Sequence, residues 1–496
     1  MTPQAPREAR EGPEALETPP FYDVEQRRTL VISALAIVIG IAAVGIARLL
    51  IASIALVTNA TFHGTFTIFN ATPTGNHLGI FVVFVPVIGG LIVGVLARYG
   101  SGAIRGHGIP EAMEQILTNE SNISPKVMVL KPLSAAIAIG TGGPFGAEGP
   151  IIATGGALGS LVGQVLHTTP DERKTLLAAG AAAGMAAIFG TPVAAVLLAI
   201  ELLLFEYRPR SLVPVALASA TATAIRMVFE GSEGVFAMPQ LTNPSGEALV
   251  TYMVLGAIVG VAAVLVTKSL YYIELGFEKL PVHWMWFPAI GAVVVGIIGY
   301  FEPRTMGVGY DNISNILAGN FTNAVLISMV VLKFLSWSIA LGSGTSGGTL
   351  APLFTIGGGL GALLGIVCVH WFPGLGVDPR IAALVGMAAI FAGASRALLT
   401  SVVFAFETTR QPIGLLPLLG GCTAAFIISS LMMRYTIMTE KLARRGTHVP
   451  TEYIAAAPEV IARIDAEAVR QRHFELPPEL GGPRRREKAS RDTEIL

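Results

Sequence analysis

Long apolar runs constrain the fold of this chain more than any other feature of its sequence. A helix that crosses a bilayer needs about 20 mainly apolar residues, with a range of roughly 17 to 25. Six runs meet that length, at residues 30–57, 78–97, 249–266, 284–300, 324–341 and 415–432. Only 13% of the residues are charged, about half of the share found in soluble domains. The sequence therefore predicts an all-α polytopic membrane protein.

Shorter apolar segments, interrupted by glycine and proline, lie between these runs. They occupy residues 132–146, 150–166, 175–189, 192–204, 352–369 and 381–391. Broken helices persist in a bilayer only where protein or a water-filled cavity shields the freed backbone groups. We therefore expect broken, tilted helices that surround an internal site.

An internal repeat divides the chain into two halves. A shift of 202 residues places PIIATGGALGSLVG, which begins at Pro150, on PLFTIGGGLGALLG, which begins at Pro352. The same shift places the hexamer GMAAIF at 184–189 on an identical hexamer. We interpret the membrane domain, 27–446, as two copies of one unit, at about 27–230 and 248–446. A polar N-terminal tail, 1–26, and a charged C-terminal tail, 447–496, flank this domain.

Glycine and proline also mark the starts of three helices. Pro110, Pro150 and Pro352 each follow a glycine-containing turn, and proline favours the first turn of a helix, where its missing N–H is not needed. A helix N-terminus carries unpaired N–H donors and partial positive charge, which attract anions. Duplicated membrane folds bind their substrate where broken helices from both halves meet. The pattern therefore favours a small anion as the substrate.

Glu148 is the only ionisable residue in the apolar stretch 135–166. A carboxylate inside a membrane is energetically costly and usually functional. Since Glu148 stands at the start of a helix, its side chain would occupy the place of an incoming anion. We interpret it as a gate that the anion displaces and that protonation releases. A structural N-cap of the same helix is the alternative interpretation, and the two roles are compatible.

These motifs resemble those of the CLC family of chloride channels and transporters. GHGIP at 106–110 is similar to the family's GSGIP, GAEGP at 146–150 to its GREGP, and GTLAP at 348–352 to its GxFxP. The resemblance covers roughly residues 27–446 and is to bacterial members without regulatory CBS domains. It implies a CLC-type fold with two inverted structural repeats. It also implies a homodimer with one anion pathway per subunit, gated by Glu148.

The resemblance also identifies the residues that would bind the anion. They belong to the first motif, to the backbone near the next two helix starts, and to the last short helix. The predicted anion-binding residues are Gly106, His107, Gly108, Ile109, Pro110, Gly149, Ile151, Thr349, Leu350 and Met438. By the same comparison, Glu407 holds a helix end near the dimer interface.

Three departures from the family pattern affect the expected mode of transport. His107 replaces the motif's serine, Met438 replaces a tyrosine, and Leu202 stands where proton-coupled members have an internal glutamate. The loss of that glutamate favours uncoupled, channel-like flux. Proton-coupled chloride antiport stays open, because a chain of water molecules could carry protons past Leu202. His107 and Met438 leave fluoride or nitrate open as the transported anion.

Other function classes fit the sequence less well. A formal net charge of zero argues against nucleic acid as a partner. The scattered histidines form no HExxH motif, so we expect no enzyme, cofactor or metal. A carrier of cations or organic solutes would need a polar cluster deep in the membrane, for which only Glu148 and Glu201 are candidates. Basic clusters beside the first and last spans predict a lipid-embedded cell-membrane protein with both termini in the cytoplasm.

Overall fold

The computed structural model describes residues 20–69, 71–447 and 449–450. Of residues 20–26 it describes the backbone alone. In this part of the chain the regular elements are helices, joined by short 3-10 and π turns, and no strand occurs. The α-helices are α1 (Pro20–Thr58), α2 (Phe84–Val95), α3 (Ile109–Thr118), α4 (Pro125–Gly140), α5 (Glu148–Val165), α6 (Pro170–Phe189), α7 (Pro192–Leu198), α8 (Pro209–Glu230), α9 (Gly246–Glu278), α10 (Phe287–Phe301), α11 (Tyr310–Ala318), α12 (Asn323–Gly342), α13 (Leu350–Trp371), α14 (Pro379–Ser395), α15 (Leu398–Thr409), α16 (Leu415–Met432) and α17 (Glu440–Arg444).

Eight helical segments in the described part of the chain are long and apolar enough to cross a membrane. They contain α2, α8, α9, α10, α12, α13 and α16, and the part of α1 that begins at Arg27. The six apolar runs of the sequence coincide with six of them, to within one residue at 78, so the prediction of a polytopic helical protein is confirmed. The span Pro209–Glu230 escapes a search for apolar runs, because Arg210, Arg226 and several hydroxyl side chains interrupt it. Leu350–Trp371 is one continuous helix and not an interrupted segment.

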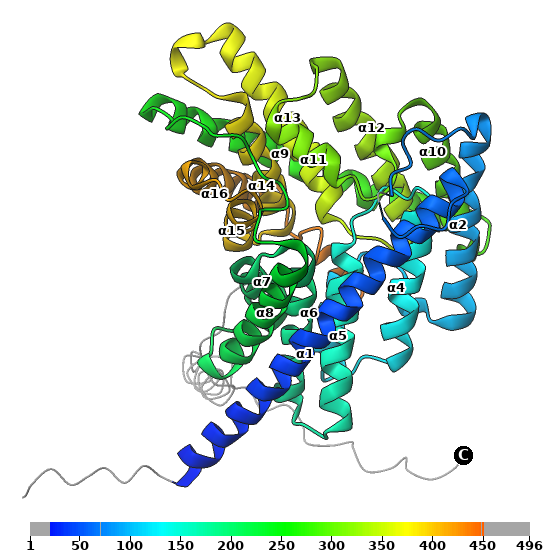
Figure 1. Cartoon of the computed structure of the whole chain (residues 1–496), viewed down its shortest axis with the longest axis vertical. Coiled ribbons are helices and arrows are strands. Elements are labelled where there is room, and N and C mark those ends of the chain that lie inside the picture. The colour runs from blue at the N-terminus through cyan, green and yellow to red at the C-terminus, as the bar shows by residue number, and fades with distance from the viewer. Residues whose placement is uncertain (1–19, 70, 448, 451–496) are drawn as a thin grey trace, which may run out of the picture. The chain divides into compact units, whose positions relative to one another are not determined.

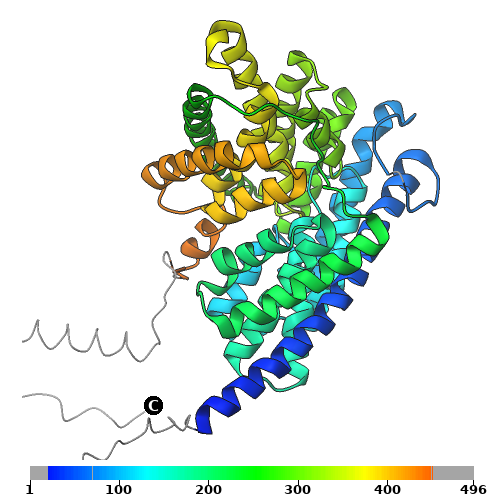
Figure 2. The same ribbon diagram turned by 60° about the vertical axis from the view of Figure 1, so that its left-hand side comes forward.

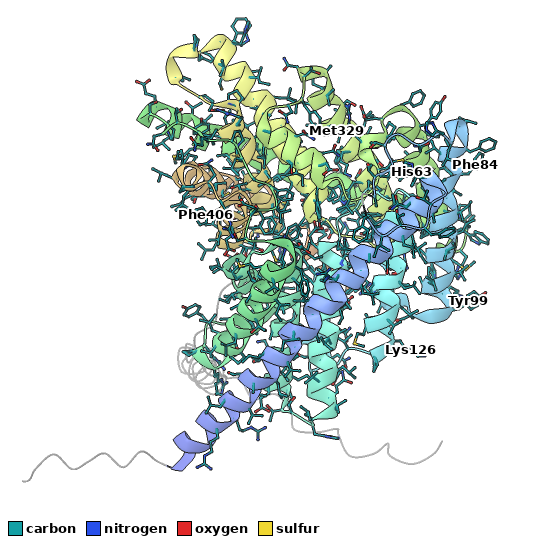
Figure 3. The ribbon with its side chains drawn as sticks, viewed as in Figure 1. His63, Phe84, Tyr99, Lys126, Met329 and Phe406 are labelled. Carbon is teal, nitrogen blue, oxygen red and sulfur yellow. The ribbon has the colours of Figure 1, made fainter. Side chains whose placement is uncertain are left out.

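Apolar side chains cover the outer surface of the spanning helices. In the span Gly79–Gly100, Phe84 and Tyr99 lie on the outside toward its two ends, 57% and 80% exposed (Figure 3). Aromatic side chains near the ends of a span are typical of the boundary between lipid and water. The surface therefore fits a bilayer as its solvent.

Helices α1–α8 and α9–α16 form two halves with the same internal packing. Helix α5 packs against α4 and α6, as α13 packs against α12 and α14. Helix α1 contacts α4, α6 and α8, as α9 contacts α12, α14 and α16. The contact of α1 with α8 is visible in both Figure 1 and Figure 2. The repeat found in the sequence is therefore a structural repeat.

The core lies around α6 and α14, the helices that carry the identical hexamers. Every residue from 175 to 189 and from 381 to 395 is buried. Small residues let the neighbouring helices approach closely. A Cβ atom added at Gly159 of α5 would lie 1.9 Å from the carbonyl oxygen of Leu176, and one at Gly361 of α13 would lie 2.2 Å from that of Ala382. Glycine is therefore required at both helix contacts.

Helices α5 and α13 begin at the same place and run apart. Gly146 and Gly348, just before the two helices, form an antiparallel bridge in which the Gly348 N–H donates to the Gly146 carbonyl at 3.0 Å. Figure 1 shows α13 in the upper half of the view and α5 in the lower half. Equivalent helices that leave a shared point in opposite directions are what an inverted repeat requires. The predicted all-α fold with two inverted repeats is confirmed.

The helix ends refine the expected boundaries. Helix α1 begins at Pro20, ahead of residue 27, because proline is well tolerated in a first helical turn. Helix α8 ends at Glu230 and α9 begins at Gly246, on the two sides of the proposed junction. The rest of the predicted tails, 1–19, 448 and 451–496, lies outside the described residues.

Candidate functional site

The three motifs of the sequence meet at the starts of α5 and α13. Gly106 of the first motif forms a parallel bridge with Ser346, just ahead of the third motif. A Cβ atom added at Gly149 would lie 1.9 Å from the carbonyl oxygen of His107 and 3.0 Å from the Cα of Gly348. Backbone from all three motifs is therefore in direct contact, although the sequence separates them widely.

Glu148 lies at this meeting point. It is the first residue of α5, and its side chain is fully buried. The Tyr310 hydroxyl donates a hydrogen bond to its Oε1 atom at 3.0 Å. Its Oε2 atom has no hydrogen-bond partner among the described residues, and it lies 2.8 Å from the position that a Cβ of Gly348 would take. The carboxylate thus lies between the start of α5 and the turn that leads into α13.

Two side chains of the predicted anion-binding set are buried here with unpaired polar atoms. His107 is 7% exposed and Thr349 is 1% exposed. The Nδ1 atom of His107 and the Oγ1 atom of Thr349 have no hydrogen-bond partner among the described residues. A buried polar atom without a partner costs about 1–3 kcal/mol, and both groups can donate a hydrogen bond to an anion.

The backbone amides of the predicted set fall into two groups. The Gly108 N–H donates to the Glu111 carboxylate at 2.7 Å, and the Ile151 N–H donates to the Ala147 carbonyl at 3.1 Å. These two amides are engaged within the protein in this structure. The first residues of a helix have no preceding turn to supply acceptors, so Gly149, Thr349 and Leu350 provide the favourable positions.

Met438 is fully buried, on the turn before α17. The last short helix, α17, contacts α3, the helix that begins within the first motif. Tyr271 of α9 also reaches this turn, but its hydroxyl donates to the Ile437 carbonyl at 2.8 Å. That hydroxyl is therefore engaged and does not replace the one that Met438 lacks. Ile109 and Pro110 are buried in the first turn of α3.

Two buried lysines beside the site escaped the sequence analysis. Lys131 of α4 donates to two backbone carbonyls in the turn before α3, at 2.8 Å each. Lys333 of α12 donates to two carbonyls in the turn before α11, at 2.9 and 3.3 Å. The shift of 202 residues relates the two lysines, so the repeat contained the signal needed to find them. Lys333 thus lies beside the turn that leads into Tyr310, the hydrogen-bond partner of Glu148.

Two glutamates cap helices in the opposite half of the chain. The Glu201 carboxylate accepts hydrogen bonds from two N–H groups in the first turn of α15, at 3.0 and 2.9 Å. The Glu407 carboxylate accepts from two N–H groups in the first turn of α7, at 3.1 and 2.8 Å. The helix-end role predicted for Glu407 is confirmed, and Glu201 has the same role.

Leu202 is buried in the main hydrophobic core. The acidic residues nearest to it in the sequence already have partners. Glu201 caps α15, and Glu206 accepts a hydrogen bond from Ser211 at 2.7 Å and pairs with Lys174. Glu201 and Glu206 therefore have structural roles, because each carboxylate is engaged with partners of its own.

Comparisons with known proteins agree with this architecture, which defines an anion-transport protein of the CLC fold. The family described as voltage gated chloride channel matches residues 89–430. The H(+)/Cl(-) exchange transporter ClcA of Vibrio campbellii is 30% identical over 369 residues, which cover 71% of this chain and 79% of that protein. The putative chloride channel protein ClcB-like of Ralstonia nicotianae is 28% identical over 366 residues, 73% and 85% of the two chains. The chain belongs to the voltage-gated chloride channel family.

Solved structures show the same fold. A slow cyanobacterial Cl-/H+ antiporter superposes with a TM-score of 0.72 at 23% identity, covering 84% of this chain and 98% of that one. A CLC-type fluoride/proton antiporter superposes with a TM-score of 0.67 at 21% identity, covering 85% and 98%. Together with the eight candidate spans, the family and the fold establish a multi-pass membrane protein.

Proposed function

We propose that this protein carries chloride, or a similar small anion, across the cell membrane along a pathway gated by Glu148. The observation that carries the proposal is the buried Glu148 carboxylate at the meeting point of the three motifs. The carboxylate and a free anion are both attracted to the same helix N-termini. The anion must therefore displace the side chain in order to bind there. Protonation removes the negative charge and with it the attraction that holds the side chain in place.

The anion-binding residues that we propose surround this position. Gly149, Thr349 and Leu350 contribute amides at helix starts, and the unpaired atoms of His107 and Thr349 contribute side-chain donors. Gly106, Gly108, Ile109, Pro110 and Ile151 form the backbone that shapes the pathway, and Met438 forms an apolar wall at its other end. His107 and Met438 differ from the family's hydroxyl residues, so fluoride and nitrate are the alternative anions to test.

Two modes of transport are candidates, uncoupled flux of the anion and exchange of the anion for protons. The burial of Leu202 and the engagement of Glu201 and Glu206 support uncoupled flux. The names of relatives, H(+)/Cl(-) exchange transporter ClcA and Cl-/H+ antiporter, support proton-coupled exchange. Simultaneous records of chloride efflux and external pH from vesicles decide between them, because only an exchanger drives protons against their gradient when chloride flows.

We further propose a homodimer in the cell membrane, with one pathway in each subunit and both termini in the cytoplasm. Exposed apolar residues on α8 and α16, such as Leu217 and Leu416, would bury against the second subunit. Basic residues gather beside the start of α1, where Arg28 pairs with Glu172 and Arg210 with Asp171. Such clusters favour the cytoplasmic side.

Efflux of chloride from vesicles that contain the purified protein tests the gate. Glu148→Gln removes the charge and Glu148→Ala removes the side chain, so both should change the rate of efflux and abolish its dependence on pH. Glu247→Gln is the matched control, because Glu247 is an exposed glutamate in the first turn of another spanning helix, α9. If the two Glu148 variants keep the wild-type rate and pH dependence, Glu148 is not the gate.

A further inference from the structure

Tyr310 makes the contact that joins Glu148 to the second half of the chain. It is the first residue of α11, and its hydroxyl donates to Glu148 Oε1 at 3.0 Å across a separation of 162 residues. We propose that Tyr310 is a positioning residue for the gate, whose hydroxyl holds the ionised Glu148 side chain in the anion pathway and opposes its displacement. This inference rests on the role of Glu148 in the proposed function.

Lys333 and a glycine turn fix the backbone that leads into Tyr310. Lys333 binds two carbonyls of the turn that precedes the helix, and its Nζ atom lies 3.4 Å from the position that a Cβ of Gly309 would take. Gly309 has a φ of +76°, which residues with side chains rarely adopt. A buried ammonium group and a glycine turn therefore set the point from which the Tyr310 side chain extends.

The ring of Tyr310 is held by other aromatic residues. It makes edge contacts with Phe189 at 5.5 Å and with Phe236 at 5.8 Å between ring centroids. Phe189 also contacts Phe404 of α15 at 5.0 Å, and Phe189 and Phe236 are buried. Because the ring is already immobilised, the hydroxyl loses little conformational freedom when it binds the carboxylate. The cluster therefore favours a persistent hydrogen bond.

The internal repeat shows that this contact is specific to one half. A shift of 201 residues places Gly106, Gly108 and Ile109 on Gly307, Gly309 and Tyr310, and the shift of 202 places Glu148 on Leu350. Isoleucine cannot donate a hydrogen bond, and leucine cannot accept one. The two halves thus share the glycine turn and the buried lysine. Only one half carries the donor and only the other carries the acceptor.

The expected consequence follows from competition between the carboxylate and the anion. A hydrogen bond to an ionised group is stronger than a bond between neutral groups. Its loss in Tyr310→Phe should therefore weaken the hold of Glu148 about tenfold or more. A weaker competitor leaves the site to the anion more often, so the half-saturating chloride concentration should fall by about the same factor. The phenylalanine ring keeps the aromatic contacts.

Calorimetric titration of the purified protein with chloride measures this effect. The variants are Tyr310→Phe, Glu148→Ala and the double variant, with Tyr252→Phe as the matched control. Tyr252 is also buried, and its hydroxyl accepts the Asp378 backbone N–H at 2.8 Å, so Tyr252→Phe removes a buried tyrosine hydroxyl and its hydrogen bond from another part of the fold. We expect tighter chloride binding in Tyr310→Phe, wild-type binding in Tyr252→Phe, and no further change when Tyr310→Phe is added to Glu148→Ala.

The outcomes separate this inference from the proposed function. Wild-type binding by Tyr310→Phe, beside tighter binding by Glu148→Ala, would overturn the role of Tyr310 alone. An equal effect of Tyr310→Phe with and without Glu148 would also overturn it, because the hydroxyl would then act on the anion directly. Unchanged binding and flux in Glu148→Ala would instead overturn the gate. If Tyr310→Phe does not fold, replacement of Tyr310 by 3-fluorotyrosine retains the ring and strengthens the donor, and chloride binding should weaken.

Discussion

The contact between α5 and α6 provides a direct test of how closely these membrane helices are packed. In Gly159→Ala, the new Cβ would lie 1.9 Å from the carbonyl oxygen of Leu176, 2.6 Å from its carbonyl carbon and 3.0 Å from the Cα of Leu177. All three atoms belong to backbone, so no side-chain rotation relieves the overlap. The helices would have to separate by about 1.5 Å to restore an ordinary contact distance of about 3.5 Å.

The cost of that separation can be bounded from the geometry. Overpacking of a well-packed interior costs about 1–3 kcal/mol, and a clash with rigid backbone belongs at the upper end. We expect Gly159→Ala to lower the free energy of unfolding by about 3 kcal/mol. The repeat predicts the same loss for Gly361→Ala, whose Cβ would lie 2.2 Å from the carbonyl oxygen of Ala382.

The control for this prediction is Gly45→Ala in α1. Gly45 is an exposed glycine within a spanning helix, and a Cβ there would meet nothing within 4 Å. Alanine forms helices better than glycine by about 1 kcal/mol, so this variant should be neutral or more stable. Unfolding in mixed micelles with increasing dodecyl sulfate, followed by tryptophan fluorescence, measures all three variants. Equal stability of Gly159→Ala and Gly45→Ala would refute the inferred packing.

Two further predictions concern charged side chains. Glu407→Ala removes the acceptor of two N–H groups at the start of α7, so it should lower the free energy of unfolding by about 1–2 kcal/mol, and an unchanged value in the same unfolding assay would exclude the capping role. The guanidinium of Arg28 lowers the pKa of Glu172 to about 2, so this pair should stabilise the fold fully above about pH 4.3, and its contribution should fade as the pH drops toward 2. Unfolding measured against pH should show this loss in the wild type and not in Arg28→Ala, and matching profiles would count against the pair.

Much of the fold could be predicted from the sequence, because the sequence features that indicate it are local. Span length, apolar composition and the glycine and proline positions each depend on neighbouring residues only. The repeat can also be detected without a structure, since identical segments such as GMAAIF recur at a constant shift. These signals sufficed to predict the helical membrane fold, the two halves and the position of Glu148 at a helix start. They failed at Pro209–Glu230, where polar residues that pack against other helices mask a span.

The tertiary structure alone decided which side chains act on one another. Tyr310 meets Glu148, Lys333 holds the turn before α11, and Glu201 and Glu407 cap helices in opposite halves. No spacing along the chain encodes these pairs, because each depends on how two inverted halves dock and on which side chains then come within hydrogen-bond distance. The sequence by itself determined the helical membrane fold, its repeat and the helix starts marked by glycine and proline. The docking of the halves determined the partners of each buried charge, since burial makes an unpaired charge too costly to leave in place.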